Sequence, residues 1–124
     1  MIDFNNSVFV KLKQCDVRHF SSMIQPFFAA GEEALLSFVG IRDGVVFTNK
    51  RILAINVQGL TGAKKDFTSL PYAKIQAFSV ESAGTLDRDS ELELWFSGMG
   101  KVKFEFSRGT DIVPIGRLIS QFTL

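Results

Sequence analysis

Several residue types that carry specialised chemistry are nearly missing from this chain. Among its 124 residues, cysteine, histidine, tryptophan and tyrosine each occur once. The single cysteine, Cys15, excludes a disulfide within the chain and fits a reducing compartment. The single histidine, His19, has no further ligand residue at metal-site spacing. We therefore expect neither a metal site nor histidine-based catalysis, and we interpret Cys15 as an ordinary packed or exposed thiol.

Long hydrophobic runs and an excess of one charge are also absent. The longest apolar runs fall far short of the roughly 20 residues that span a bilayer, and the first residues lack the pattern of a secretory signal. The 14 basic and 13 acidic residues leave a net charge of +1, which argues against a large nucleic-acid surface. We expect a soluble cytoplasmic protein that binds no nucleic acid.

Phenylalanine, in contrast, is abundant, with 13 residues in a chain that is 46% hydrophobic. Its ring has no polar group, so these side chains are suited to a core or a dry interface. A domain of this length buries roughly two-thirds of its unfolded surface and needs no metal or disulfide to fold. The composition predicts one globular domain.

The first thirty residues have a mixed pattern. Val8–Lys13 is compatible with a short strand, the start of a helix or a mobile arm. Asp16 can cap a helix over Val17–Gln25, which Pro26 would end. Apolar side chains share one face of that helix: Phe20, Met23 and Ile24.

From Glu33 onward the apolar residues recur at every second position, as in β-strands. Seven strands are expected, over residues 33–41, 45–48, 51–57, 64–70, 74–82, 91–97 and 101–107. Asn49-Lys50 stands where a two-residue hairpin loop would stand, and asparagine tolerates the positive φ of such a loop. Gly59-Leu60-Thr61-Gly62 predicts a second turn between strands.

The last two of these strands alternate strictly between apolar and polar positions. The apolar positions, expected to point inward, are Leu92, Leu94, Phe96, Val102, Phe104 and Phe106. The outward positions are acidic on the first strand and mostly basic on the second, which favours antiparallel pairing. Trp95 is the exception, because the alternation points its ring outward together with the charged side chains.

The final segment returns to helical spacing. Thr110 or Asp111 can cap a helix that tolerates Pro114 in its first turn. Its apolar stripe consists of Ile112, Ile115, Leu118, Ile119 and Phe122. The complete pattern predicts a mainly β fold, with about seven antiparallel strands in a strongly bent sheet or open barrel that this helix caps. Residues 1–30 are expected to form an arm and a helix within the same unit as residues 31–124.

Two motifs invite a ligand-binding interpretation, and both are better explained as turns. Asp87-Arg88-Asp89 opens like a calcium loop, but Leu92 and Gly98 stand where that loop needs glycine and glutamate. Gly59–Lys65 has neither the helix N-terminus nor the Gly-Lys-Ser/Thr ending of a phosphate loop. No spacing of carboxylates singles out an acid–base pair. We expect no enzymatic activity and no cofactor.

Six linked motifs resemble a known family: Phe47-Thr48-Asn49-Lys50-Arg51, Gln58-Gly59-Leu60-Thr61-Gly62, Ser69-Leu70-Pro71-Tyr72, Phe78-Ser79-Val80-Glu81-Ser82-Ala83-Gly84, Glu91-Leu92-Glu93-Leu94-Trp95 and Arg108-Gly109-Thr110-Asp111-Ile112. In this order and spacing they look like the bacterial pleckstrin-homology-like family, long known as a domain of unknown function. The resemblance covers roughly Gly31 to Leu124, and the first thirty residues depart from the usual family start. It implies a seven-stranded pleckstrin-homology-like barrel capped by the C-terminal helix. It also implies homo-oligomers, often rings, with no established ligand or enzymatic activity.

Trp95 is the leading candidate for a contact residue, because aromatic side chains are enriched at the centres of interfaces. The alternative is that a helix of the same chain covers it. The first thirty residues add three aromatic candidates: Phe20, Phe27 and Phe28. The preferred hypothesis is a non-enzymatic module that assembles with copies of itself through these side chains and serves as a protein-interaction scaffold.

A second hypothesis is a peripheral lipid- or peptide-binding module that uses the barrel mouth. Its candidate contacts are basic: Lys50, Arg51, Lys64 and Lys65. Eukaryotic pleckstrin-homology domains often hold phosphoinositides with basic residues around the loop between their first two strands. The corresponding Gly40–Gly44 here contains one base beside an acid, which counts against phosphoinositide binding. A solvated surface is the simpler explanation of the basic pairs.

Overall fold

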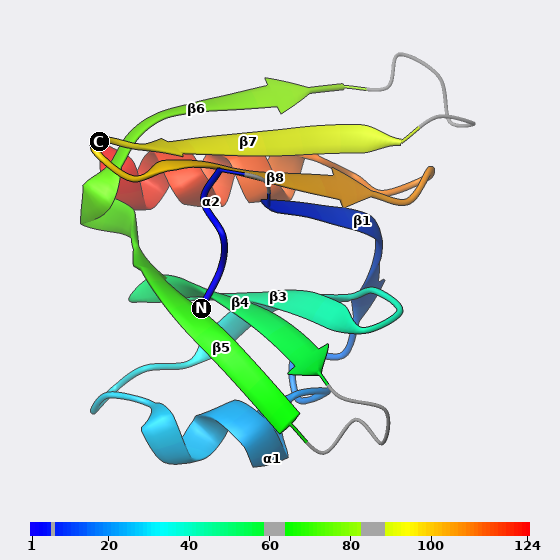
Figure 1. The fold of residues 1–124 in the computed structure, drawn as a ribbon, viewed down its shortest axis with the longest axis vertical. Helices are drawn as coiled ribbons and strands as arrows, with labels where there is room; N and C mark the ends of the chain where they lie inside the picture. Colours follow the sequence, from blue (N-terminus) through cyan, green and yellow to red (C-terminus); the bar gives the residue numbers. More distant parts are fainter. Residues whose placement is uncertain (6, 59–63, 83–88) are drawn as a thin grey trace.

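A computed structural model gives the fold of the chain and describes residues 1–5, 7–58, 64–82 and 89–124 (Figure 1). The elements in chain order are β1 (Ser7–Cys15), α1 (Ser21–Ile24), η1 (Gln25–Phe27), β2 (Ala34–Val39), β3 (Asp43–Thr48), β4 (Arg51–Gln58), β5 (Lys64–Pro71), η2 (Tyr72–Lys74), β6 (Ile75–Glu81), β7 (Ser90–Phe96), β8 (Gly100–Phe106) and α2 (Val113–Thr123). The expected turn at residues 59–62 and the start of the calcium-like motif at residues 87–88 lie outside the described residues.

The strands form one strongly bent sheet in the order β5-β4-β3-β2-β1-β8-β7-β6. Neighbouring strands are antiparallel except β1 and β8, which are parallel. Figure 1 shows β6, β7 and β8 in one layer, β3, β4 and β5 in the other, and β1 at the side where the layers meet. The predicted mainly β fold with a terminal helix is confirmed, and the seven expected strands correspond to β2–β8.

Strand β1 is an eighth strand, formed by the segment whose structure the sequence left open. Its first half pairs with β8, as in Phe9 opposite Phe104, and its second half pairs with β2, as in Cys15 opposite Ser37. The register shifts between Phe9 and Leu12, where Lys11 has a φ of 52°. This left-handed residue bends the strand. One strand therefore belongs to both layers and buries Phe9 and Leu12 between them.

The main core lies between the two layers. All six side chains predicted to point inward from the last two strands are buried. Helix α2 completes this core with Ile115, Leu118 and Ile119, together with Ile112 just before the helix. Phe122 stacks on Tyr72 with ring centroids 4.9 Å apart. Val113 N–H donates to Asp111 Oδ1 at 3.1 Å, and proline stands in the first turn. The prediction that this helix caps the barrel is confirmed.

The N-terminal helix is shorter than predicted. The sequence predicted a helix over residues 17–25, whereas α1 has four residues and continues directly into η1. Asp16 does not cap a long helix, because its carboxylate accepts from Arg18 N–H at 2.8 Å in a tight turn. The two short helices cover the outer face of the β2–β5 layer and form a second core, whose buried members are Ile24, Val46, Leu53 and Ile55.

The hairpin between β3 and β4 also differs from prediction. Lys11 is the only non-glycine with positive φ among the described residues, so Asn49 does not adopt the left-handed conformation expected of it. Instead the Thr48 hydroxyl oxygen accepts from Lys50 N–H and Arg51 N–H, both at 3.0 Å. A side chain therefore closes this turn, and no left-handed backbone is needed.

Candidate functional site

The outer face of β7 carries a large, uncovered aromatic ring. Trp95 is 47% exposed and lies between Ala77 on β6 and Lys101 on β8 in the strand register. Helix α2 packs on the inner side of the sheet, and α1 packs on the other layer. The outward orientation predicted for Trp95 is confirmed, and the alternative that a helix of the same chain covers it is wrong.

Small side chains on β6 leave a shallow hollow beside this ring. Ala77 and Ser79 are exposed on the same outer face. The hollow has a volume of about 160 Å³ and is lined by Ala77, Phe78, Ser79, Glu93 and Trp95. Sequence reasoning missed Ala77 and Ser79, although both occupy outward positions of a strand that pairs with β7. The hollow gives Trp95 free space on its β6 side.

Charged side chains next to Trp95 neutralise one another. Lys101 Nζ lies 3.4 Å from Glu93 Oε1, and Lys103 Nζ lies 3.6 Å from Glu91 Oε2. These pairs run diagonally across antiparallel strands β7 and β8, and the antiparallel pairing expected from the two charged rows is confirmed. Such partly exposed pairs contribute little stability. Because these charges are paired, Trp95 is the large apolar side chain on this part of the surface.

The three phenylalanines of the predicted interface lie on the opposite layer. Phe27 is 62% exposed and contacts Phe67 of β5 edge-on, with centroids 5.1 Å apart. Phe20 and Phe28 are half-buried in the second core under α1. Figure 1 places α1 and β7 at opposite ends of the molecule. Trp95 and these rings therefore cannot form one continuous patch on a single copy of the chain.

Arg51, predicted as a lipid or anion contact, is occupied within the chain. Its Nε lies 3.0 Å from Glu32 Oε2 and its Nη2 lies 3.0 Å from Glu32 Oε1. Nη2 also donates to the carbonyl of Phe27 at 2.9 Å. This bidentate pairing uses the guanidinium face that an external anion would need. The structure therefore assigns Arg51 to an internal ion pair.

Glu32 is the buried end of that ion pair, and its side chain has no solvent exposure. Burial by itself raises the pKa of Glu32. Hydrogen bonds from Arg51, from Ala29 N–H at 2.9 Å and from the Thr48 hydroxyl at 2.7 Å outweigh burial and lower the pKa below its usual value. We call Glu32, Thr48 and Arg51 the Glu32 network.

Two neighbours extend the Glu32 network into the rest of the fold. Asn49 Nδ2 donates to the carbonyl of Gly31, and Glu33 N–H donates to Asn49 Oδ1, both at 2.9 Å. Tyr72 Oη donates to the carbonyl of Thr48 at 2.7 Å. The Thr48–Arg51 motif therefore ties residues 27–33 and η2 to one hairpin. Sequence reasoning had interpreted this motif as a hairpin turn and missed its bonds to Glu32 and Tyr72, because these partners are distant in the chain.

The remaining basic candidates are exposed but do not converge. Lys50 lies in the turn before β4, whereas Lys64 and Lys65 begin β5. Arg51 pairs with Pro71 and Gln58 with Lys64, so the two groups lie at opposite ends of the same strand pair. At about 3.3 Å per residue this separation is roughly 23 Å. One headgroup or small anion cannot reach both groups.

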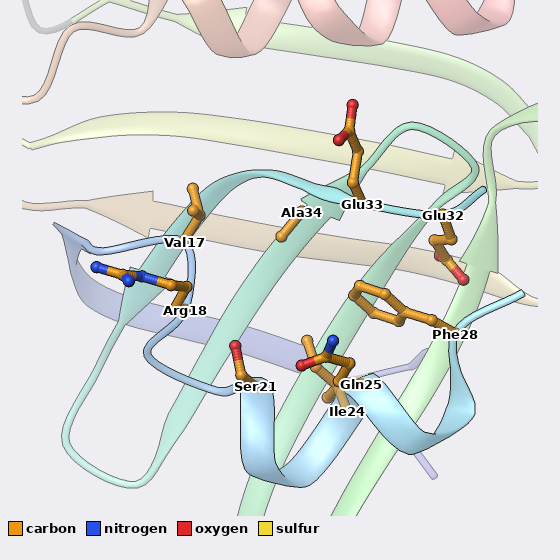
Figure 2. A pocket seen from close by; sticks show the side chains of 9 residues that line it. All are labelled: Val17, Arg18, Ser21, Ile24, Gln25, Phe28, Glu32, Glu33 and Ala34. Carbon is orange, nitrogen blue, oxygen red and sulfur yellow. The ribbon is translucent and has the colours of Figure 1, made fainter. Parts of the chain in front are cut away.

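A larger cavity of about 450 Å³ lies between α1 and the chain that enters β2 (Figure 2). Its lining residues are Val17, Arg18, Ser21, Ile24, Gln25, Phe28, Glu32, Glu33 and Ala34. Two of its three charged lining residues are already engaged, because Arg18 pairs with Asp16 and Glu32 with Arg51. The cavity offers an apolar floor of Ile24 and Phe28 without a converging polar set.

No catalytic or metal-binding constellation is found among the described residues. No three of their His, Cys, Asp or Glu side chains come together at metal-binding distance. His19 is exposed and packs against the ring of Phe20, while Cys15 Sγ lies 3.4 Å from Ser37 Oγ. Within the same residues, no helix is long and apolar enough to cross a membrane.

Comparison with known proteins decides the family. The family model of the bacterial PH domain matches residues 3–123. The chain belongs to the bacterial PH domain family. The match includes the N-terminal segment, so the resemblance placed on residues 31–124 was too narrow. Strand β1 and helix α1 are therefore parts of this bacterial PH domain.

Solved structures agree with this assignment. A DUF1696 family protein with a pleckstrin-homology domain from Shewanella loihica PV-4 has a TM-score of 0.80 and 39% identity, over 93% of this chain and 99% of that one. A pleckstrin-homology domain from Shewanella amazonensis SB2B has a TM-score of 0.69 and 40% identity, over 89% and 90% of the two chains. The pleckstrin-homology-like fold is confirmed.

A curated relative leaves the role of this PH domain open. The uncharacterised protein YjqA of Bacillus subtilis (strain 168) is 41% identical over 92 residues, which are 73% of this chain and 74% of the relative. The family and its relatives identify a bacterial PH-like domain of unknown function. The surfaces of the domain are the remaining guide to a more specific role.

Proposed function

We propose that this bacterial PH domain is a non-enzymatic module that assembles with copies of itself into a closed homo-oligomer, such as a ring, and acts as a scaffold for protein interactions. The observation that carries the proposal is Trp95, an exposed ring beside the hollow formed with Ala77 and Ser79. Tryptophan is enriched among the residues that dominate interface energies. Its neighbours Glu93 and Lys101 pair with each other, so a partner need not supply countercharges.

A non-catalytic role agrees with the chemistry on the described surface. The cavity beside α1 and the hollow beside Trp95 have no histidine or cysteine among their lining residues. The Glu93 carboxylate, which lies opposite Ser79 in the hollow, is paired with Lys101. The most strongly bonded carboxylate, Glu32, is shielded from solvent by its own chain. We place the module in the cytoplasm because its single cysteine fits a reducing compartment.

Light scattering with mass determination tests self-assembly directly. At tens of micromolar, the wild-type chain is expected to have the mass of a multimer. Trp95→Lys should shift the mass toward smaller species, because a charge at a desolvated interface centre is costly. Ile41→Lys is the matched control, since Ile41 is also exposed but lies in the turn between β2 and β3. A monomeric wild type overturns the proposal, and an unchanged mass in Trp95→Lys removes Trp95 from the interface.

A second candidate function is a peripheral lipid- or peptide-binding module. The observation that favours it is the adjacent exposed pair Lys64 and Lys65 at the start of β5. Vesicles of anionic and of neutral lipid, sedimented with the protein, distinguish it from self-assembly. Binding to anionic vesicles that disappears with salt and with Lys64→Glu/Lys65→Glu supports this function, because surface charges are screened by salt. Absence of binding at low salt excludes it for these lipids.

A further inference from the structure

Residues 1–5 cross from one layer of the sheet to the other, and we call this segment the strap. Ile2 N–H donates to Thr68 Oγ1 of β5 at 3.0 Å, and Lys101 N–H of β8 donates to the Phe4 carbonyl at 3.1 Å. Figure 1 shows the strap in dark blue, running from the layer of β3, β4 and β5 toward the layer of β6, β7 and β8. The strap therefore links the two layers in addition to β1.

The side chains of the strap alternate between the core and the solvent. Ile2 and Phe4 are 5% and 9% exposed and belong to the main core, whereas Asp3 and Asn5 are exposed. Phe4 packs edge-on against Phe96 of β7, with ring centroids 5.8 Å apart. The fold therefore holds an extended segment by two apolar side chains that are separated by one exposed residue.

The turn between β7 and β8 leaves room for the strap. Gly100 has a φ of +128°, and a Cβ at this position would lie 2.5 Å from the carbonyl oxygen of Phe4. Gly98 in the same turn also has a positive φ, of +78°, but a Cβ there would meet nothing within 4 Å. Glycine at position 98 thus serves the turn alone, whereas glycine at position 100 also admits the strap backbone. The residues that hold the strap, called the strap site below, are Thr68, Phe96, Gly100 and Lys101.

The strap site bonds to main-chain atoms of the strap, namely Ile2 N–H and Phe4 C=O. Any extended segment offers the same groups, so these bonds do not depend on the sequence of the strap. Asp66, two positions before Thr68, is only partly used. Its Oδ2 lies 2.8 Å from Met1 N, but its buried Oδ1 has no hydrogen-bond partner among the described residues. Since buried acceptors are normally paired, a segment with a donor side chain at this position would fit better than the strap does.

The strap is short, and few interactions hold it. Met1 is 81% exposed, and the contact between Met1 N and Asp66 is an exposed ion pair, which contributes little stability. Ordering the five residues costs chain entropy, which offsets much of the gain from burying Ile2 and Phe4. Such segments open locally while the rest of a domain stays folded. The strap can therefore leave its site without unfolding the sheet.

We propose that the strap site binds an extended peptide segment of a partner protein, and that residues 1–5 occupy it as an internal competitor. The segment that fits has a large apolar residue, any residue and an aromatic residue in succession. A residue with a hydrogen-bond donor in its side chain precedes them and reaches Asp66 Oδ1. The inference goes beyond the proposed self-assembly, because it uses the inner side of the sheet and not the outer face around Trp95. Light scattering decides self-assembly separately.

Fluorescence anisotropy of a labelled peptide tests the site. The probe is Met-Ile-Asp-Phe-Asn with a fluorophore at its amidated C-terminus. The variant Ile2→Ser/Phe4→Ser should bind it at least about tenfold more tightly than wild type, in which the strap competes at a millimolar effective concentration. Asp3→Ser/Asn5→Ser is the matched control, because it changes the exposed positions of the same segment and should bind as weakly as wild type.

Two further peptides test the specificity of the strap site. A peptide with serine in place of its isoleucine and phenylalanine should not bind, and one with lysine in place of its methionine should bind more tightly through Asp66 Oδ1. Circular dichroism shows whether Ile2→Ser/Phe4→Ser is folded. Lack of binding to the folded variant, or equal binding to this variant and to wild type, overturns the proposal. Equal affinity of the methionine and lysine peptides removes the donor residue from it.

A second measurement on the wild type decides the matter even if the serine variant does not fold. Lys101 N–H, which donates to the strap, should exchange at least about tenfold faster than the slowest amides of β7 and β8, at a rate that mild denaturant leaves unchanged, because local opening exposes little surface. Gly100→Ala should move the Ile2 methyl signals toward their unfolded positions in NMR spectra, and the matched Gly98→Ala should not. Exchange of Lys101 that follows global unfolding, or equal effects of the two glycine variants, contradicts a displaceable strap.

Discussion

Arg51 and Glu32 form a bidentate ion pair that is buried on the Glu32 side, with both N–O distances at 3.0 Å. The two residues belong to different elements, since Glu32 precedes β2 and Arg51 begins β4. Through the carbonyl of Phe27, Arg51 also holds the end of η1. The pair therefore fixes the short N-terminal helices against the sheet, where apolar packing alone would leave their position less defined.

Arg51→Met is expected to destabilise the fold by about 3–5 kcal/mol, because it leaves the Glu32 carboxylate buried without its cation. Urea unfolding measures the loss. Lys50→Met, at the exposed neighbouring position, is the control and should change stability by less than about 0.5 kcal/mol. Equal effects of the two substitutions would show that the ion pair is not what stabilises this region.

Acid should weaken the Glu32 network in a defined direction. The pKa of Glu32 is lowered in the fold from its ordinary 4.5, so its contribution is complete above 4.5 and is lost as the pH falls through the lowered pKa. Stability of the wild type and of Glu32→Gln, measured between neutral and acidic pH, should therefore converge on acidification. The exposed Glu33→Gln is the matched control. A constant difference across this range contradicts the assignment.

Tyr72 should remain protonated in the folded protein under alkaline conditions. Burial raises its pKa above the ordinary value of 10.0, and the charge of Glu32 raises it further. Its stability contribution is thus full below the unfolded pKa and disappears as the pH rises through the folded one. Tyr72 is the only tyrosine, so tyrosinate absorbance reports on it alone. We expect this absorbance to appear only together with unfolding; ionisation near pH 10 in a folded chain would contradict the burial.

Lys11→Gly is expected to stabilise the fold, or at least to cost nothing. A left-handed lysine costs about 1–2 kcal/mol, which glycine avoids, although glycine loses more chain entropy on folding. Lys13→Gly is the matched control in the same strand, because Lys13 has no positive φ and should lose about 0.5–1 kcal/mol. Thermal unfolding compares them. If both variants lose the same stability, the bend at Lys11 stores no strain.

Strands β2–β8 could be predicted from the sequence because most show local alternation, while β3 and β4 are short apolar runs bounded by turn residues. Leu92 and Leu94 are buried while Trp95 on the same strand is exposed, as period two requires. β1 could not be assigned, because its pairing partners are remote and its register breaks at Lys11. Alternation says which residues share a face, and it does not say which distant strand lies beside them.

The candidate site was predictable to a similar extent. The outward direction of Trp95 follows from local pattern, but the hollow at Ala77 depends on which strand pairs with β7. The ion pair of Arg51 could not be predicted, because charge alone does not reveal Glu32, 19 residues away. Phe20 and Phe28 were predicted as contact residues because the sequence does not show that α1 folds onto the sheet and half-buries them.

The parallel pairing of β1 with β8 sets the time at which the chain can finish folding. Ser7 lies opposite Val102, a separation of 102 − 7 = 95 residues. During synthesis at roughly 5–20 residues per second, β1 waits roughly 5–20 s before its partner strand exists. For that interval Phe9 lacks the β8 partner that it lies opposite in the folded domain, so this core is completed only after the C-terminal part of the chain has been made.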